Sequence, residues 1–380
     1  MLNYEFPPVG GGGGWVTYFL GKHFAEAGHE VLLITSQYRG LPQDEVIEGF
    51  HVHRVPVLRK SKDVCGVHEM FTYVVSSSVS SLRVVRRFQP ELVQVFFGIP
   101  SGGGAYLLKK IFGIPYVVFL GGRDVPRPNP DPLYYQWLYA ILAPAIRAIW
   151  RQATTVVACS DGLRELALRT DPNTKIKVIP DGLDLGRFSS VARQAHPEQV
   201  RILTVGRLIP RKGFQFLIRA LPEVMQHASC EFKIELVGDG PYRAELVKLA
   251  DELGVRHKIH FAGSVPYSDL PQKYHEADIF TLCSSAEGMP LVVLEAMGSG
   301  LPVAASRVQG IEDLVEVGVN GTLFPPGDVD ELAQGLISLI NDGNSRIKMG
   351  KASIARVQKY DWKNIAQSYL EIYQRILRSK

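Results

Sequence analysis

The chain has 380 residues, of which 46% are hydrophobic and 21% are charged. This length is too great for one ordinary core, so we expect two domains, and the composition is typical of a soluble globular enzyme. The net charge of +4 is too small to indicate nucleic acid binding. No signal peptide and no apolar run of membrane-spanning length is visible. We expect a cytoplasmic protein because the scattered cysteines, described below, fit a reducing compartment.

The charges are unevenly divided along the chain. Residues 1–180 hold 19 Lys and Arg against 14 Asp and Glu, a balance of +5, whereas the remainder holds 23 against 24, a balance of −1. The excess fits weak peripheral contact with the anionic inner face of the cell membrane, a domain that handles anionic substrates, or chance. The four cysteines are scattered and form no CxxC pair, which indicates neither a zinc site nor disulfides and fits a reducing compartment.

Strand-like runs alternate with helix-like runs along the whole chain, which predicts mostly parallel sheets covered on both faces. We therefore expect two consecutive doubly wound halves. The strands expected in the first half are His29–Thr35, Phe50–Val57, Leu92–Phe97, Tyr116–Leu120, Thr154–Cys159 and Ile176–Ile179. Those expected in the second half are Arg201–Val205, Phe232–Val237, Lys258–Ala262, Asp278–Cys283, Pro302–Ala305 and Thr322–Phe324. The expected helices include Trp15–Ala27, Phe214–Gln226, Glu245–Leu253, Asp330–Ile340 and Trp362–Leu377.

An unbroken run of glycines, Gly10 to Gly14, lies between Pro7-Pro8 and the expected helix at Trp15. Glycine lets a phosphate approach the backbone, and the start of a helix supplies N–H groups, so Gly12, Gly13 and Gly14 are candidates for binding a diphosphate. The run matches neither a P-loop nor the G-x-G-x-x-G pattern. The alternative interpretation is a flexible surface linker.

Aromatic and basic residues gather between Arg123 and Trp150, after a proline-rich stretch. Such residues stack on sugars or lie against lipid headgroups, but the same pattern fits a loop that leads into an ordinary core helix. The apolar stretch Met70–Phe88, which carries three arginines, is a weaker candidate for the same surface. Further on, Pro180 to Phe188 and the polar residues up to Gln199 lack periodicity and precede a new strand. We place the domain boundary there, with domains at 1–183 and 184–360.

The segment from Gly206 to Gly213 follows the first strand of the second half. Arg207 leaves the carboxyl end of that strand, where ligands of open α/β sheets bind. Lys212 stands just before the next helix, so an arginine fork and a lysine charge would converge on a diphosphate. The alternative is a pair of solvated cations in a turn.

Two glutamates, Glu287 and Glu295, are eight positions apart after the strand Asp278–Cys283. Glu287 stands at a strand-to-helix turn, where backbone N–H groups favour anionic or hydroxyl-rich ligands. Glu295 follows about two turns into a helix that we expect to begin at Pro290, so both carboxylates would face one cleft. Carboxylates are strong acceptors for sugar and ribose hydroxyls. The alternative is a surface glutamate in a loop and a helix glutamate paired with a cation.

Taken together, these segments resemble the family 4 retaining glycosyltransferases. The resemblance is carried by the E-x7-E pattern from Glu287 to Glu295, by G-R-x-x-x-x-K-G from Gly206 to Gly213, and by V-I-P-D-G-L-D from Val178 to Asp184, where the family has Asn in place of Asp181. It covers nearly the whole chain. It implies the α/β GT-B architecture, with two Rossmann-like doubly wound domains facing across a cleft. The second domain would hold the donor, the first would hold the acceptor, and the C-terminal helix, 361–380, would pack back on the first.

The resemblance also implies the reaction. A hexose would pass with retention from a UDP- or GDP-linked donor to a glycan or lipid-linked acceptor, with no metal and no cofactor. Arg207, Lys212 and the Gly12–Gly14 backbone would stabilise the leaving diphosphate, and Glu295 would bond the ribose hydroxyls. Glu287 would orient the sugar ring. The remaining expected donor contacts are Val265, Gly288, Met289, Pro290 and Leu291.

Besides Asp181, the chain departs from the family pattern at two further places. The turn Gly121-Gly122-Arg123-Asp124 matches the family's L-H-G-x-D element at Asp124, a candidate catalytic residue, but Gly121 stands where the family often has histidine. A full apolar strand usually comes before the Pro-Pro turn, and here only two or three residues of such a strand remain. We therefore expect an incomplete first strand, as a late start or a shortened chain would give.

Three other classes of protein compete with the transferase interpretation. A nucleotide-sugar epimerase shares the two-domain fold, but the E-x7-E and G-R…K-G elements argue against it. A sugar-nucleotide-binding protein without catalysis fits the change at Gly121 and the short first strand. An NAD-dependent oxidoreductase would need a dinucleotide fingerprint that the sequence lacks.

Overall fold

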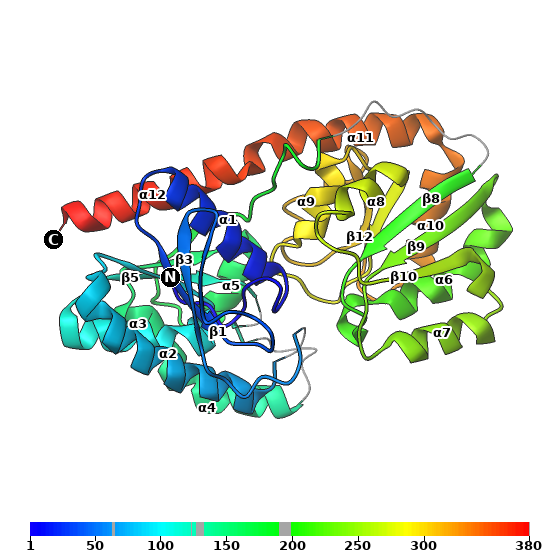
Figure 1. Cartoon of the computed structure of the whole chain (residues 1–380). Helices are drawn as coiled ribbons and strands as arrows, with labels where there is room; N and C mark the ends of the chain where they lie inside the picture. Colours follow the sequence, from blue (N-terminus) through cyan, green and yellow to red (C-terminus); the bar gives the residue numbers. More distant parts are fainter. Residues whose placement is uncertain (63–64, 123, 127–132, 190–198, 380) are drawn as a thin grey trace. The chain divides into compact units, whose positions relative to one another are not determined.

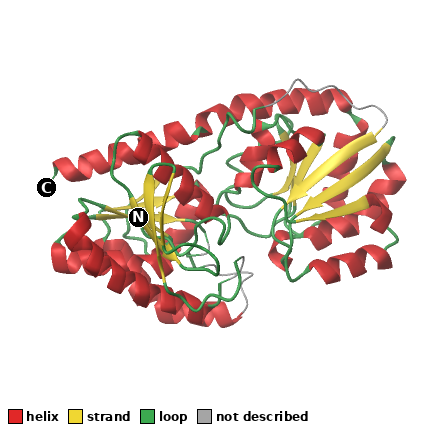
Figure 2. Ribbon diagram, viewed as in Figure 1, coloured by secondary structure: helices red, strands yellow, loops and turns green. Residues whose placement is uncertain are grey.

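The chain folds around two sets of mainly parallel strands, each covered by helices (Figures 1 and 2). The structure is a computed structural model that describes residues 1–62, 65–122, 124–126, 133–189 and 199–379. Contacts within the chain divide it into one unit of Met1–Asp181 with Trp362–Lys380 and a second unit of Gly182–Asp361. The division falls two residues before the boundary that we expect from the sequence.

The first unit is built on mainly parallel strands, and the central ones are apolar and almost fully buried, as in β5, where the five residues Tyr-Val-Val-Phe-Leu are all buried. Hydrogen bonding joins its strands in the orders β1-β3-β2 and β4-β5-β6-β7. The strands are β1 (Leu32–Ser36), β2 (Asp44–Ile47), β3 (Phe50–Val55), β4 (Val93–Phe96), β5 (Tyr116–Leu120), β6 (Thr155–Ala158) and β7 (Ile176–Val178).

The expectation of a short first strand is confirmed at Leu2. This residue forms parallel bridges to Ile34 of β1 and to Val95 of β4. Its N–H donates to Gln94 O, and its carbonyl accepts from the Phe96 N–H, both at 2.9 Å. Leu2 thus joins the strands β1-β3-β2 to the strands β4-β5-β6-β7. The combined order is β2-β3-β1-Leu2-β4-β5-β6-β7, and the direction of winding reverses between Leu2 and β4.

Strand β2 is absent from the expected elements. It runs antiparallel to β3 and its four residues are half-buried or exposed, so it has no apolar run to mark it. The connection to β3 is the dipeptide Glu48-Gly49, and both residues have positive φ, of 47° and 82°. A two-residue hairpin loop of this kind matches the twist of the strands, and Gly49 is the only sequence signal for it.

Within the part of the chain that the structure describes, the first unit has six α-helices. They are α1 (Gly12–Glu26), α2 (Val67–Phe88), α3 (Gly98–Phe112), α4 (Leu133–Gln152), α5 (Asp161–Thr170) and α12 (Trp362–Arg378). The last helix packs on the first: the Trp362 ring stacks on Phe19 with centroids 5.3 Å apart, and Tyr373 meets Phe24 edge to face. The C-terminal helix therefore contributes to the core of the first unit.

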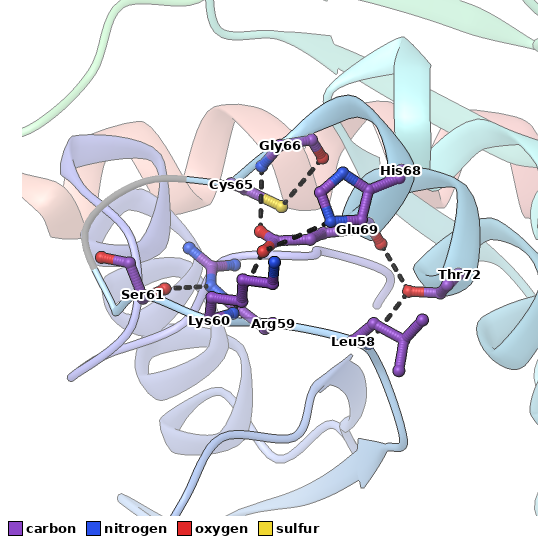
Figure 3. A network of polar contacts seen from close by, with 9 residues as sticks. All are labelled: Leu58, Arg59, Lys60, Ser61, Cys65, Gly66, His68, Glu69 and Thr72. Carbon is purple, nitrogen blue, oxygen red and sulfur yellow. Dashed lines mark hydrogen bonds and ion pairs between the residues drawn. The ribbon is translucent and has the colours of Figure 1, made fainter.

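A network of polar contacts joins residues between β3 and α2 to the start of α2 (Figure 3). The buried Glu69 carboxylate accepts from the N–H groups of Gly66, at 2.9 Å, and Lys60, at 3.1 Å. These bonds satisfy a donor at the start of α2, as in a capping box. The Arg59 guanidinium donates to three carbonyls, among them Tyr4 O at 3.1 Å. Through Arg59 the connection is tied to the segment that leads into the glycine run.

The second unit holds one six-stranded parallel sheet in the order β10-β9-β8-β11-β12-β13. Counted from β8, this is the strand order 3-2-1-4-5-6 of a doubly wound nucleotide-binding fold, which reverses between β8 and β11. The strands are β8 (Gln199–Val205), β9 (Glu231–Val237), β10 (Ile259–Gly263), β11 (Ile279–Leu282), β12 (Val303–Ser306) and β13 (Gly321–Phe324).

Two helices of the second unit, α10 and α11, begin at side-chain caps. The Asp328 carboxylate accepts from Glu331 N–H at the start of α10, and Asp342 accepts from Ser345 N–H at the start of α11, each at 2.9 Å. The α-helices are α6 (Phe214–His227), α7 (Arg243–Glu252), α8 (Leu270–Glu276), α9 (Leu291–Gly298), α10 (Val329–Asn341) and α11 (Gly343–Val357). Short 3₁₀ turns are η1 (Pro210–Lys212), η2 (Arg256–Lys258) and η3 (Gln358–Tyr360).

Helices α7 and α10 begin two residues and one residue before the expected starts, and the starts of α9 and α1 differ for physical reasons. Helix α9 begins at Leu291, because Pro290, with ψ of 112°, is its extended N-cap residue. Helix α1 begins at Gly12 and includes three of the glycines that the sequence places in a loop. Glycine is a weak helix former, so the packing of these residues must override their intrinsic preference. The α/β fold with two doubly wound parallel sheets is confirmed.

Candidate functional site

The point at which the strand order reverses in the second unit collects the predicted donor residues. Strands β8 and β11 are neighbours there, and Arg207 and Glu287 follow their carboxyl ends. Ligands of doubly wound sheets bind outside the carboxyl ends at such a reversal. The backbone therefore presents these two residues at the place where a ligand is expected.

An ion pair links the two predicted motifs. Lys212 Nζ lies 2.7 Å from Glu287 Oε1, with side chains only 13% and 9% exposed. Gly213 makes this approach feasible: its φ is +73°, and a β-carbon there would lie 1.9 Å from Cys283 O. Only glycine fits so close to the end of β11. The η1 turn therefore packs directly on the loop that carries Glu287.

Glu287 remains ionised despite its burial. Burial by itself would raise the pKa of this carboxyl, but the charges of Lys212 and Arg211 outweigh it and hold the pKa at about 2. Arg211 also donates to Ala286 O, and its own carbonyl accepts from Ser285 N–H at 2.9 Å. A fixed carboxylate flanked by two cations is suited to accept hydroxyl hydrogens beside an anionic group.

The second glutamate of the motif has a different environment. Glu295 is 4% exposed on α9, and Tyr274 of α8 donates its hydroxyl to Glu295 Oε2 at 2.7 Å. Burial raises the pKa of Glu295 to about 7, although the hydrogen bond from Tyr274 opposes the rise. The carboxyl of Glu295 therefore holds its proton more tightly than that of Glu287, and its ribose-binding role stays a prediction.

The other predicted donor contacts lie on loops of the second unit. Gly288, Met289 and Pro290 are buried between β11 and α9, whereas Leu291 is half-buried. Arg207 is half-buried after β8. Val265 is half-buried on the loop after β10, which is separated from β8 by β9, so it belongs to a neighbouring loop rather than to the ion pair.

In the first unit the glycine run already has intramolecular partners. Gly11 N–H donates to Glu5 Oε2 at 3.2 Å, and Gly14 N–H donates to Gly11 O at 3.0 Å. Gly12, Gly13 and Gly14 form the first turn of α1. The predicted phosphate contact would therefore fall on a helix N-terminus, not on a free loop, with the Glu5 carboxylate beside it.

Asp124 binds backbone groups. Its Oδ1 accepts from the N–H groups of Gly121 and Gly122 at 3.0 Å, and its Oδ2 accepts from Gly98 N–H at 2.9 Å. The residue is 4% exposed, and burial raises its pKa to about 6 against the effect of these bonds. Its observed contacts hold two turns together, and its predicted catalytic role stays a prediction. Arg123 lies outside the described residues.

Several residues with a place in these arrangements were not singled out from the sequence. Tyr274 and Arg211 touch the predicted glutamates, and Glu5 and Phe97 touch the glycine run. Tyr274 and Glu295 are 21 positions apart, so no local pattern could join them. Of these residues, only Arg211 had a signal in the sequence, because it is a basic residue next to Lys212 in the G-R…K-G element.

Among the described residues, no group of three or more His, Cys, Asp or Glu side chains is arranged to hold a metal ion. Of the helices in the same ranges, none has both the length and the apolar character that a membrane span requires.

Comparison with known proteins adds the family. The model of the glycosyl transferase 4-like domain matches residues 11–182, and that of glycosyl transferases group 1 matches residues 188–356. An uncharacterized glycosyltransferase of Methanocaldococcus jannaschii is 29% identical, covering 98% of this chain and 97% of its own. The amylovoran biosynthesis glycosyltransferase AmsK of Erwinia amylovora is 32% identical, covering 76% of this chain and 71% of its own.

The fold has a solved counterpart. Sucrose-phosphate synthase of Thermosynechococcus elongatus superposes with a TM-score of 0.86 at 22% identity, covering 97% of this chain and 94% of that one. At this identity the likeness shows the fold alone. Both halves of the sequence match glycosyltransferase family models. The chain therefore belongs to the group 1, family 4-type glycosyltransferases and has the GT-B fold.

Proposed function

We propose that this glycosyltransferase moves a hexose from a UDP- or GDP-linked donor to a glycan or lipid-linked acceptor, with retention and without a metal or cofactor. The observation that carries the proposal is the buried Lys212–Glu287 pair at the reversal point of the second sheet. It puts a cation for a phosphate and an acceptor for sugar hydroxyls on adjacent loops.

The donor is assigned to groups of the second unit. Arg207 and Lys212 would neutralise the diphosphate as negative charge develops on it, which is electrostatic stabilisation by groups already in place. Glu287 would accept hydrogen bonds from the sugar hydroxyls, because its carboxylate is ionised and held in one position. Glu295 would accept the ribose hydroxyls in its ionised form.

The first unit would complete the transfer. The N–H groups at the first turn of α1, Gly12 to Gly14, would face the diphosphate, where a helix start favours negative charge. The departing phosphate oxygen would take the proton of the attacking acceptor hydroxyl on the same face of the sugar. No carboxylate is assigned as nucleophile, so retention is attributed to this same-face route.

The first test is a melting-temperature screen of the purified protein against UDP, GDP and their hexose conjugates, followed by product analysis. A ligand at about 100 times its dissociation constant adds roughly 2.7 kcal/mol of stability. We expect a shift with one base only, and transfer of that sugar to an added acceptor. Interconversion of the donor sugar without an acceptor would indicate an epimerase, and binding without turnover would indicate a non-catalytic protein.

Three substitutions test the assignments of residues. We expect Glu287→Ala to reduce kcat far more than donor affinity, and Arg207→Ala and Lys212→Ala to weaken nucleotide binding. The matched control is Lys258→Ala, which breaks an ion pair of 2.6 Å with Glu231 at the amino end of β10, with a lysine side chain 11% exposed. Equal loss of nucleotide affinity in the control would mean that Lys212 acts only through stability.

We also propose peripheral contact of the first unit with the anionic inner face of a membrane. Along α2, Phe71, Val75 and Val79 are exposed at intervals of four residues and are followed by exposed arginines, a pattern that suits an interfacial helix. The test is sedimentation with anionic and with zwitterionic vesicles. We expect binding to anionic vesicles that Phe71→Asp weakens, while Val46→Asp, at an exposed site on β2, does not. Equal recovery with both lipids would refute the contact.

A further inference from the structure

The reversal point of the first sheet lies between Leu2 and β4, and the segment after β4 begins with Phe97. Its neighbour β5 is followed by Gly121, where the resembled family often has histidine. The Asp124 carboxylate binds the N–H groups of Gly98 and Gly121 and so fastens the two segments together. The two strand ends at this edge of the sheet are therefore held in a fixed relation.

The ring of Phe97 fills the space in which a side chain at position 121 would lie. A β-carbon on Gly121 would lie 2.4 Å from Phe97 Cε1. A β-carbon on Gly13, in the first turn of α1, would lie 2.2 Å from Cζ of the same ring. Tyr4 meets the ring edge to face, with centroids 5.4 Å apart. The phenyl group is thus placed between the α-carbons of the two glycines.

The backbone of Phe97 is strained to put the ring there. Its φ is +67° and its ψ is 114°, outside the left-handed helical region that Gln89 occupies. Phenylalanine rarely adopts positive φ, and such strain persists only where the surroundings enforce it. The enforcing bonds are Phe97 N–H to Phe119 O and Gly98 N–H to Asp124 Oδ2, both at 2.9 Å.

We propose that Phe97 is a positioning residue for the transfer reaction, whose ring replaces a side chain at position 121 and holds the first turn of α1 in place. The proposal rests on the proposed function in one respect, namely that Gly12–Gly14 face the diphosphate. It explains the departure from the family pattern: residues 97 and 121 share one space, and here the ring takes it. The acceptor side of this enzyme then carries an aromatic group in place of an imidazole.

The test is a double-substitution cycle with Phe97→Ala and Gly121→His, measured by melting temperature and by steady-state kinetics. The first change leaves a void and the second forces a clash, so each alone lowers the melting temperature. In the double variant the imidazole enters the void, and we expect a loss smaller than the sum of the two single losses. Additive losses would overturn the shared space.

The kinetic arm separates positioning from stability. We expect Phe97→Ala to lower kcat about tenfold to a hundredfold with little change in donor KM, because the α1 turn is displaced while the donor residues of the second unit are untouched. The control is Phe24→Ala, at the other end of α1, where a ring that is 4% exposed packs on Tyr373. An equal fall in kcat in the control would overturn the positioning role.

The experiments distinguish a failure of the proposed function from a failure of the proposal about Phe97. A wild-type protein that binds and transfers no nucleotide sugar would overturn that function and, with it, the kinetic arm. The melting-temperature cycle would still decide whether the ring of Phe97 and a side chain at 121 exclude each other.

Discussion

Replacement of Asp181 by asparagine gives the sharpest test of the electrostatics of this fold. Asp181 is 6% exposed at the end of the first unit's main segment, and burial raises its pKa from 3.8 to about 8. Its charge also contributes, after burial, to the raised pKa of Tyr369 on α12. The family motif has asparagine here, which has the same shape and no charge. Asp181→Asn therefore removes one titration with little change in packing.

The sign of the effect follows from the raised pKa. The folded state holds the proton more tightly than the unfolded state, so the contribution of Asp181 to stability is complete below about pH 3.8 and is lost as the pH rises to about 8. The loss is about 1.4 kcal/mol for each pH unit in this window. By pH 7 the wild type has lost roughly 4 kcal/mol of this contribution to stability, and the asparagine variant, which does not titrate, has no such loss.

The assay is urea unfolding of the wild type and of Asp181→Asn at about pH 5, 7 and 9. We expect the variant's advantage to grow by about 2–3 kcal/mol between the first two conditions and to level off above pH 8. Asp124 and Glu295, whose pKa values burial also raises, are present in both proteins and cancel in the difference. A difference that is independent of pH would show that Asp181 is ionised in the folded state and would refute the reasoning.

Three further predictions concern the candidate site. Lys212→Ala should cost about 3–5 kcal/mol in urea unfolding because it leaves the Glu287 carboxylate buried without its partner, and adding Glu287→Ala should recover part of the loss; strictly additive losses would contradict the coupling. Since the pKa of Glu287 is held at about 2, its contribution to stability is present above pH 4.5 and is lost as the pH falls towards 2. Glu287→Gln should therefore weaken the fall in unfolding free energy at acid pH. An unchanged fall would argue against the lowered pKa of Glu287. Tyr274→Phe removes the hydrogen bond that opposes the rise in the pKa of Glu295. The pH midpoint of nucleotide binding, measured by calorimetry, should therefore move upward by about one unit or more. An unchanged midpoint would mean that Glu295 does not bind the nucleotide.

The sequence was sufficient for the order and the approximate bounds of the main strands. Apolar runs such as Tyr116–Leu120 are buried on both faces, and a strand of this kind is marked by its own residues, with no partner needed. Glu287, Arg207 and Lys212 could also be located, because each follows a recognisable strand and the carboxyl ends of strands meet at one edge of a parallel sheet. The exposed strand β2 could not be predicted, because it carries no apolar run.

Contacts between residues distant in the chain were decided only by the tertiary structure. The sequence alone established the family, the two doubly wound sheets and the positions of the motifs, since these depend on local periodicity and short spacings. It could not show that Lys212 pairs with Glu287, that Tyr274 binds Glu295, or that the ring of Phe97 fills the space beside Gly121. Each of these pairs forms only when separate strands and helices pack together, and close packing then dictates which side chain occupies each space.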